Sequence, residues 1–214
     1  MDKQQELDKL NEQIKKCTAC PLFKNANLAV PGEGDSKTQV MFIGEGPGYW
    51  EDQKGRPFVG QAGKLLDELL KSIGFKRSQV FIGNVIKHRP LNNRDPLPEE
   101  IEACRPFLDQ QITIIDPKVI VTLGRFSLNK FLPGEYISHV HGQARFVDFA
   151  GKQRIVLPMY HPAAALRRGS IKEQLAADFK KILEFINNDN LVKKEDLPEE
   201  DQEKNKEKQI DLFN

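Results

Sequence analysis

The sequence contains only three cysteines and a single tryptophan among its 214 residues. Three cysteines are too few for a disulfide framework, and in a reducing compartment they indicate a metal site, a redox site or simple burial. No apolar run approaches the roughly 20 residues that a membrane span needs. Residues 1–16 are charged throughout and lack the apolar centre of a secretory signal, so we expect a cytoplasmic protein with no membrane partner.

Strong charge of either sign is also missing, because the formal net charge is only +1. This balance neither indicates nor excludes a nucleic-acid partner, since a local basic patch is enough for a small footprint on phosphates. A hydrophobic fraction of 39% is ordinary for a globular protein, and the length fits one domain with a full core. We expect this domain to act as a monomer.

Short apolar runs alternate with helical patterns along the chain. The runs end at turn residues and read as buried strands, at residues 39–44, 80–86, 118–124 and 155–160. Helices are predicted at 63–74, at 97–116 with a kink or a later start at Pro106, and at 170–186 with Ser170 and Glu173 in capping-box spacing. This alternation predicts an α/β fold with a mostly parallel sheet, whose ligands bind at the carboxyl ends of the strands.

Residues with chemical potential follow three of the predicted strands. A glycine-rich segment at 44–63 follows the first, Asn84 follows the second and His161 follows the fourth. Glycines let a backbone turn sharply and approach a ligand closely. A dinucleotide site is disfavoured, because the G-x-G-x-x-G order leading into a helix is missing.

Cys17 and Cys20 form a Cys-x-x-Cys pair near the N-terminus, and Cys104 is the remaining cysteine. Such a pair usually belongs to a set of four ligands around a metal or cluster. A thioredoxin-like redox pair is disfavoured because no strand precedes this pair.

Three long blocks, at residues 44–66, 84–96 and 160–167, resemble in order and spacing the signature blocks of family 4 uracil-DNA glycosylases, the iron-sulfur branch of their superfamily. The resemblance runs from about Cys17 to about Leu183. It implies a three-layer α/β/α sandwich and a DNA repair hydrolase that cleaves the N-glycosidic bond of uracil and leaves an abasic site. A non-catalytic DNA-binding or damage-sensing module and an electron carrier are the alternatives.

The resemblance also implies a ligand set for a [4Fe-4S] cluster. The family places a cysteine where this chain has His88, so the implied ligands are Cys17, Cys20, His88 and Cys104. Imidazole replaces thiolate at iron in Rieske centres. Ligand chemistry alone favours zinc for three cysteines and a histidine, and the third possibility is an exposed histidine with three structural thiols.

Site roles follow from the same blocks. Phe58 matches the ring on which the extruded base stacks, Asn84 the base-reading amide and His161 the histidine near the uracil O2. The alternatives for these three are a core aromatic, a turn residue and a helix cap. Glu45 matches a pocket residue, and Gly46 stands where better-known uracil glycosylases have a water-positioning aspartate. Gly48 likewise replaces a tyrosine that blocks thymine, so how thymine is excluded stays open.

DNA contacts are expected from the rim of the site. Basic side chains flank the three blocks and can meet phosphates, namely Lys87, Arg89, Arg94, Arg167 and Arg168. Leu166 matches the family's wedge into the vacated base stack. His139 and His141 are interpreted as strand or turn residues, because no acid or cysteine accompanies them.

The chain divides into a glycosylase-like domain with its metal-binding segment at 1–190, a charged linker at 191–208 and a terminal peptide at 209–214. The peptide resembles the short motif by which bacterial proteins dock on the replication sliding clamp, with Gln209, Leu212 and Phe213 as its contacts. A linear motif at the end of a tether suits such docking.

Overall fold

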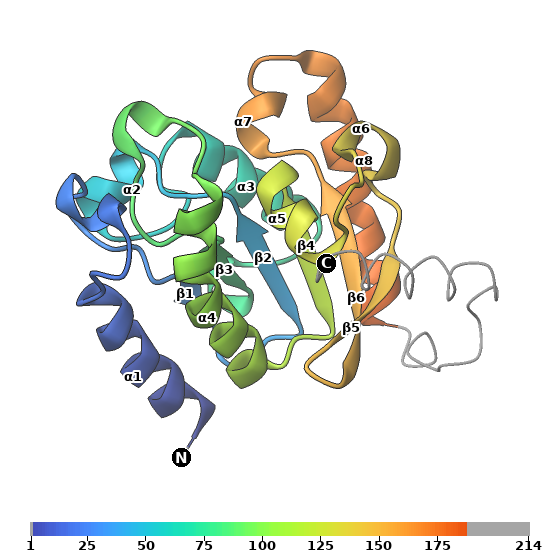
Figure 1. Cartoon of the computed structure of the whole chain (residues 1–214). Helices are drawn as coiled ribbons and strands as arrows, with labels where there is room; N and C mark the ends of the chain where they lie inside the picture. Colours follow the sequence, from blue (N-terminus) through green and yellow to red (C-terminus); the bar gives the residue numbers. More distant parts are fainter. Residues whose placement is uncertain (1, 188–214) are drawn as a thin grey trace.

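The computed structural model describes residues 2–187 and shows one six-stranded sheet with helices on both faces (Figure 1). The strand order is β1-β3-β2-β4-β6-β5. The four inner strands are parallel, and the two edge strands pair antiparallel with their neighbours. The predicted mostly parallel sheet is therefore confirmed. The linker and the terminal peptide lie outside the described residues.

The four predicted strands are the four inner strands of the sheet. The strands are β1 (Glu33–Gly34), β2 (Val40–Gly44), β3 (Phe81–Asn84), β4 (Val119–Leu123), β5 (Arg145–Phe149) and β6 (Lys152–Met159). The two edge strands were missed. β1 has only two residues, and β5 is only half-buried along most of its length, so neither carries a strong apolar run.

Helices form the outer layers. The α-helices are α1 (Lys3–Lys15), α2 (Tyr49–Lys54), α3 (Gln61–Ser72), α4 (Pro98–Ile115), α5 (Arg125–Phe131), α6 (Ile137–Val140), α7 (Pro162–Ala165) and α8 (Gly169–Ile186), with short 3₁₀ turns at Pro21–Lys24, Arg77–Gln79 and Leu91–Asn93. Within residues 2–187, no helix combines the length and the apolar character that crossing a membrane requires.

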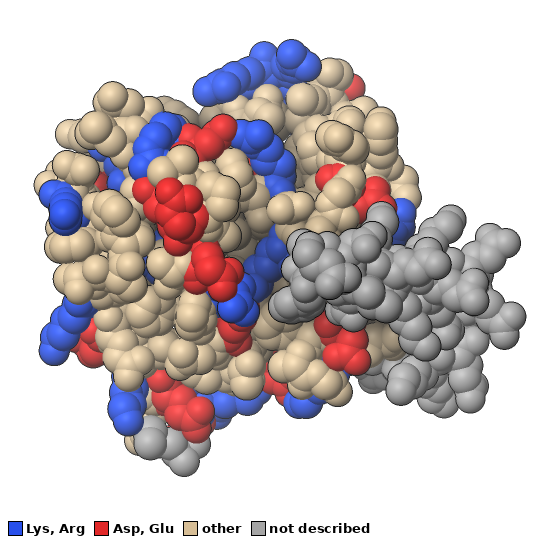
Figure 2. Space-filling view, in the orientation of Figure 1, with Lys and Arg blue, Asp and Glu red and all other residues tan. Residues whose placement is uncertain are grey.

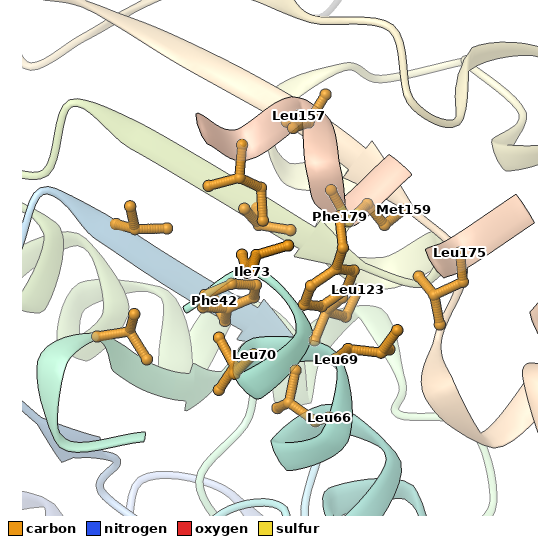
Figure 3. Close-up of a cluster of buried hydrophobic side chains, with 14 of the residues drawn as sticks. Phe42, Leu66, Leu69, Leu70, Ile73, Leu123, Leu157, Met159, Leu175 and Phe179 are labelled. Carbon is orange, nitrogen blue, oxygen red and sulfur yellow. The ribbon is translucent and has the colours of Figure 1, made fainter. Parts of the chain in front are cut away.

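One face of the sheet packs against α3 and α8. Phe42 of β2 stacks on Phe179 of α8 with ring centroids 5.7 Å apart, and leucines of α3 fill the space beside them (Figure 3). Alternate residues of each strand point to opposite faces, so Met41 and Ile43 contribute to the second core instead. The three-layer arrangement follows from these two separate clusters.

The second face packs against α4, and α1 packs beside α4 (Figure 1). Helix α1 was not predicted, although Leu7, Leu10 and Ile14 have helical spacing and are buried. Helix α4 continues through Pro106 without the predicted change of start. Its buried face, which includes Cys104, packs on the sheet and stabilises the helix despite the lost hydrogen bond.

Two local predictions were wrong. Helix α8 begins at Gly169 after an extended Arg168, so Ser170 lies inside the helix and forms no capping box. His139 lies in α6 and not in a strand or turn, whereas His141 lies in the turn after α6, which is one of the two predicted alternatives. His141 also has an acidic partner after all, because its Nδ1 lies 2.7 Å from an oxygen of the buried Asp178.

Candidate active site at the strand ends

A cavity of about 550 Å³ opens where the four parallel strands end. Glu45 follows β2, Asn84 ends β3, Gly124 follows β4 and His161 follows β6, and all four line the cavity together with Phe58. Because parallel strands present their carboxyl ends at one edge of the sheet, residues far apart in sequence meet there.

Phe58 and Asn84 approach each other over Gly44. A Cβ atom on Gly44 would overlap Asn84 Oδ1 and would lie 2.7 Å from two carbons of the Phe58 ring. No side chain larger than hydrogen fits there, so Gly44 is required for the two groups to share one pocket.

The loop that carries Phe58 is held in a strained conformation. Phe58 has a φ of 50°, which is uncommon for a residue with a side chain. Arg77 donates to the carbonyl oxygens of Pro57 and Phe58. Glu51 Oε1 accepts hydrogen bonds from the backbone nitrogens of the two residues that follow Phe58, at 2.8 and 2.9 Å. These contacts fix the ring at the cavity wall. The support from Arg77 was not predicted, because no local sequence pattern indicates this long-range contact.

Asn84 brings a buried amide without a protein partner for its oxygen. The residue is only 1% exposed, and Oδ1 is buried with no hydrogen bond from any described residue. An unpaired buried polar atom is costly, so its persistence at a cavity wall indicates a ligand that supplies the missing donor.

His161 lies beside the Phe58 ring, with ring centroids 5.4 Å apart and an angle of 26° between the planes. Its Nδ1 accepts a hydrogen bond from Ala163 N at 3.1 Å, so His161 is also the helix cap of α7. Burial lowers the pKa of His161 to about 4. At neutral pH the ring is therefore uncharged, and because Nδ1 is an acceptor, its proton is on Nε2.

Glu45 is fixed at the start of α5. Its Oε1 accepts from Arg125 N at 2.7 Å and from Phe126 N at 3.3 Å. Burial raises the pKa of the Glu45 carboxyl group, and the two backbone donors oppose this rise. The other oxygen, Oε2, makes no hydrogen bond with any residue in 2–187 and can accept one from a small molecule in the cavity.

Residues 31–186 match the family model of the uracil DNA glycosylase superfamily. The chain belongs to this superfamily. It is 50% identical over 185 residues to a type-4 uracil-DNA glycosylase of Sulfurisphaera tokodaii, covering 84% of each chain. It is 48% identical to one of Archaeoglobus fulgidus, covering 85% of this chain and 94% of the relative, and 46% identical to one of Thermotoga maritima, covering 83% and 93%.

The packing around the glycosylase's glycine loop explains why a carboxylate is missing from position 46. A Cβ atom on Gly46 would lie 2.7 Å from the buried side chain of Ile86, so an aspartate would displace Ile86. A Cβ atom on Gly48 would lie 2.8 Å from Glu51 Oε2. Asp52 is fully buried and accepts hydrogen bonds from Asn27, so it holds the N-terminal segment rather than a substrate.

The structure corrects one predicted DNA contact of the glycosylase. Lys87 is completely buried and donates to Asn84 O at 2.9 Å and to Gln111 Oε1 at 2.7 Å, so it cannot reach a phosphate at the rim. Burial lowers the pKa of Lys87 to about 8.

Arg94 is paired with Glu100. Arg167 lines the cavity, and Leu166 is 50% exposed next to it.

The predicted metal ligands of the glycosylase lie in one region. Cys20 and Cys104 belong to one buried cluster of side chains, and Cys17 and His88 both line a hollow of about 580 Å³. Burial raises the pKa of the Cys104 thiol to about 11. Within residues 2–187, no three histidine, cysteine or acidic side chains are close enough together to hold a metal ion. The four-ligand set therefore stays a prediction.

Proposed function

We infer that this protein is a DNA repair enzyme that hydrolyses the N-glycosidic bond of uracil in DNA and leaves an abasic site. Its match to the superfamily and its similarity to type-4 uracil-DNA glycosylases over most of both chains support this activity. The single observation in the structure that supports it best is the buried, unpaired Oδ1 of Asn84 in a cavity shared with Phe58 and His161.

Base recognition uses the Asn84 amide and the Phe58 ring. A base paired within a duplex is out of reach, so the deoxyuridine must first be turned out of the stack. In the cavity, Asn84 Oδ1 accepts from the uracil N3–H, and the amide nitrogen donates to O4. Cytosine has no proton on N3, so it cannot donate to Asn84 Oδ1. It carries an amino group at C4, so it offers no acceptor to the amide nitrogen. The face of Phe58 supports the ring of the extruded base.

Departure of the base depends on His161. As the glycosidic bond breaks, its electron pair moves onto the uracil ring, and negative charge grows on O2. A neutral His161 donates its Nε2–H to O2, and this hydrogen bond strengthens as the charge develops. Because the ring is held by Ala163 N and faces Phe58, it needs little rearrangement for this role.

Water reaches the sugar with the help of Glu45. Its Oε1 is occupied by backbone donors, and Oε2 can accept a hydrogen bond from a water molecule. The water oxygen bonds to the positively charged sugar carbon, and its proton passes to the carboxylate or to solvent. An oxocarbenium-like sugar accepts even a weakly activated water, which is consistent with Gly46 in the place of an aspartate.

Arg89, Arg167, Arg168 and Leu166 are the proposed DNA contacts. Figure 2 shows basic side chains along the upper edge of the molecule, where α2 and α7 lie in Figure 1, with acidic side chains between them. Within residues 2–187 these arginines form no ion pair, so their charge is available to phosphates. The exposed Leu166 can fill the gap that the extruded base leaves.

We further propose that Cys17, Cys20, His88 and Cys104 hold a [4Fe-4S] cluster, with zinc as the alternative. The donor set suits either group. Burial lowers the pKa of His88 below its ordinary value, and the Asp52 carboxylate opposes this only in part. A neutral imidazole is therefore available as a ligand. When bound, the group would cross-link the N-terminal segment, the loop after β3 and α4. Absorbance near 400 nm, an approximate value for iron-sulfur charge transfer, would distinguish the cluster from zinc.

Docking of Gln209, Leu212 and Phe213 on the sliding clamp is a separate proposal that rests on the sequence of the terminal peptide. Deletion of residues 209–214 should abolish clamp binding and leave excision from short oligonucleotides unchanged. Clamp binding that persists after the deletion would contradict this proposal.

Action on DNA agrees with the cytoplasmic location expected from the sequence. That location and the monomeric state stay predictions.

Incubation with a uracil-containing oligonucleotide followed by alkali tests the activity. An abasic site breaks under alkali, so we expect a strand break at the uracil position and none in an oligonucleotide with thymine there. If neither single-stranded nor double-stranded substrate were cut, the enzymatic interpretation would fail and a non-catalytic DNA-binding module would replace it.

A further inference from the structure

Exposed apolar side chains gather around the mouth of the cavity. The described residues contain seven exposed large apolar side chains, and six of them adjoin in sequence a residue that lines the cavity, namely Tyr49, Trp50, Leu91, Leu97, Tyr136 and Leu166. Single exposed apolar residues are ordinary on protein surfaces, but concentration around one opening indicates a binding surface.

Tyr49 and Trp50 form the aromatic part of this surface. They are the first two residues of α2, directly after Gly48, which lines the cavity, and they are 49% and 54% exposed. Their rings meet edge to face at a centroid distance of 5.1 Å and an angle of 77°. This contact restrains both rings, so they can receive a flat partner with little loss of side-chain freedom.

The loop that holds Phe58 also supports Trp50. A Cβ atom on Gly60 would lie 3.5 Å from Trp50 Cδ1, so the indole packs over Gly60. Gly60 N in turn donates to Glu51, the residue after Trp50. The indole and the base-stacking ring are therefore connected through one hydrogen-bonded loop, and the exposed ring lies at the edge of the uracil cavity.

Basic groups beside the rings indicate a nucleic-acid partner rather than an apolar protein surface. The guanidinium of Arg89 lies 5.2 Å from the centroid of the Tyr49 ring and donates to Asn93 at 2.7 Å. Asn93 lines the cavity. Within residues 2–187 neither Arg89 nor Arg167 has an acidic partner, so aromatic faces and free positive charge occur together. This combination is the usual one in proteins that bind single strands.

We propose that Tyr49 and Trp50 form a stacking platform for an unpaired nucleobase that neighbours the extruded uracil, while Arg89 contacts the adjoining phosphate. The inference rests on the proposed glycosylase function and adds a strand preference to it. In a duplex both faces of a paired base are covered by its neighbours, whereas a base in a single strand offers an open face. The platform therefore favours uracil in single-stranded DNA.

Trp50 is the only tryptophan in the chain, so its fluorescence reports on the platform directly. Titration with a single-stranded, uracil-free thymidine oligonucleotide should quench the fluorescence at the same concentrations at which the anisotropy of a labelled oligonucleotide rises. The same sequence annealed to its complement should quench much less. Binding without quenching would overturn the proposal, as would a fluorescence change that depends on protein concentration without DNA, since that indicates self-association.

Kinetics supply the second test. On a single-stranded uracil oligonucleotide, Trp50→Ala should raise KM about tenfold with little change in kcat, and Trp50→Phe should restore most of the loss. On duplex substrate the KM of Trp50→Ala should stay close to that of the wild type. Leu28→Ala is the control, because Leu28 is the one exposed large apolar residue of the described chain that adjoins no residue of the cavity lining. An equal rise of KM in both alanine variants would contradict a specific platform.

A substrate with an abasic analogue in place of a base next to the uracil completes the design. The analogue should raise KM for the wild type, and it should add nothing for Trp50→Ala, because the stacking partner is already absent. Equal effects on the two proteins would overturn the inference. If the wild type released no uracil from any substrate, the glycosylase function would fail instead, and the fluorescence titration would still test the platform.

Discussion

At the scale of single residues, the site depends on polar atoms that the fold leaves without partners. Asn84 Oδ1 is buried and unpaired at the cavity wall, while Lys87, three residues on, is fully buried and holds the backbone oxygen of Asn84. The side chain and the strand end are thus fixed before any ligand binds. A preformed amide of this kind recognises a base without a further ordering cost.

Replacement of Asn84 tests this recognition. Asn84→Ala should lower kcat/KM for uracil excision by about 10- to 100-fold, since each lost hydrogen bond to a buried group costs about 1–3 kcal/mol. Asn11→Ala is a matched control, because Asn11 also has a buried, unpaired Oδ1 but lies in α1 away from the cavity. Equal losses of activity in the two variants would show that the effect is one of folding.

The pH dependence of the reaction tests the charge state of His161. Its pKa of about 4 lies below the ordinary value of 6.5, so the neutral form persists as the pH falls through 6.5 and is lost only near 4. The Glu45 pKa is raised, so its carboxylate is lost at a higher pH than an ordinary glutamate. We expect the excision rate to fall as the pH is lowered, first where Glu45 is protonated. Glu45→Gln should slow single-turnover excision and remove this first decrease, the first acid limb of the pH–rate profile. A limb near 6.5 that persists in Glu45→Gln would contradict a neutral His161.

The sequence was a good guide to which residues enter the site and a poor guide to how they are held. Phe58, Asn84 and His161 were predicted from the signature blocks and line one cavity. Lys87 was misplaced because a lysine in a basic stretch looks exposed, and only the packing of α4 against β3 shows that it is buried. The support that Arg77 gives to Phe58 depends on a long-range contact and has no local signal.

At the scale of elements, the start of α5 positions the carboxylate of Glu45. Gly124 precedes this helix with a φ of +99°, and a Cβ atom there would lie 2.5 Å from Glu45 Oε1. The turn must therefore be glycine both for its backbone and for the space it leaves. Inner strands and long helices were predictable from apolar periodicity, whereas α1 was overlooked among charged residues and β1 is too short to show a pattern.

Gly124→Ala should separate these two requirements. We expect a loss of about 1–3 kcal/mol in unfolding free energy from backbone strain, and a fall in kcat of about 10- to 100-fold because Glu45 is displaced. Gly151→Ala is the control, since Gly151 has a φ of +74° and a Cβ atom there would meet no described atom within 4 Å beyond its chain neighbours. Thermal unfolding should shift in both variants, and kcat should fall only in the first. Unchanged kcat in Gly124→Ala would remove Glu45 from the mechanism.

At the scale of the whole molecule, the predicted metal ligands come from three separate parts of the chain. Cys17 and Cys20 follow α1, His88 follows β3 and Cys104 lies in α4. A bound group would therefore join the N-terminal segment to the loop directly after the base-reading strand. Asp52 makes a second connection by accepting hydrogen bonds from Asn27.

His88→Ala tests the ligand assignment through metal content and stability. We expect less bound iron or zinc per chain and a lower unfolding temperature, because a structural metal contributes folding free energy. His139→Ala is the control, since His139 lies in α6 outside the ligand set. Equal metal content in the two variants would count against His88 as a ligand.

The most direct test of the central claim is the single-turnover rate of uracil release by His161→Ala. If His161 donates to the departing base in a pocket that it shares with Phe58 and Asn84, the rate should fall by about 100- to 1000-fold, with the far-ultraviolet circular dichroism of the folded protein preserved. His139→Ala should react at the wild-type rate. A His161→Ala protein that is folded and releases uracil as fast as the wild type would contradict the account.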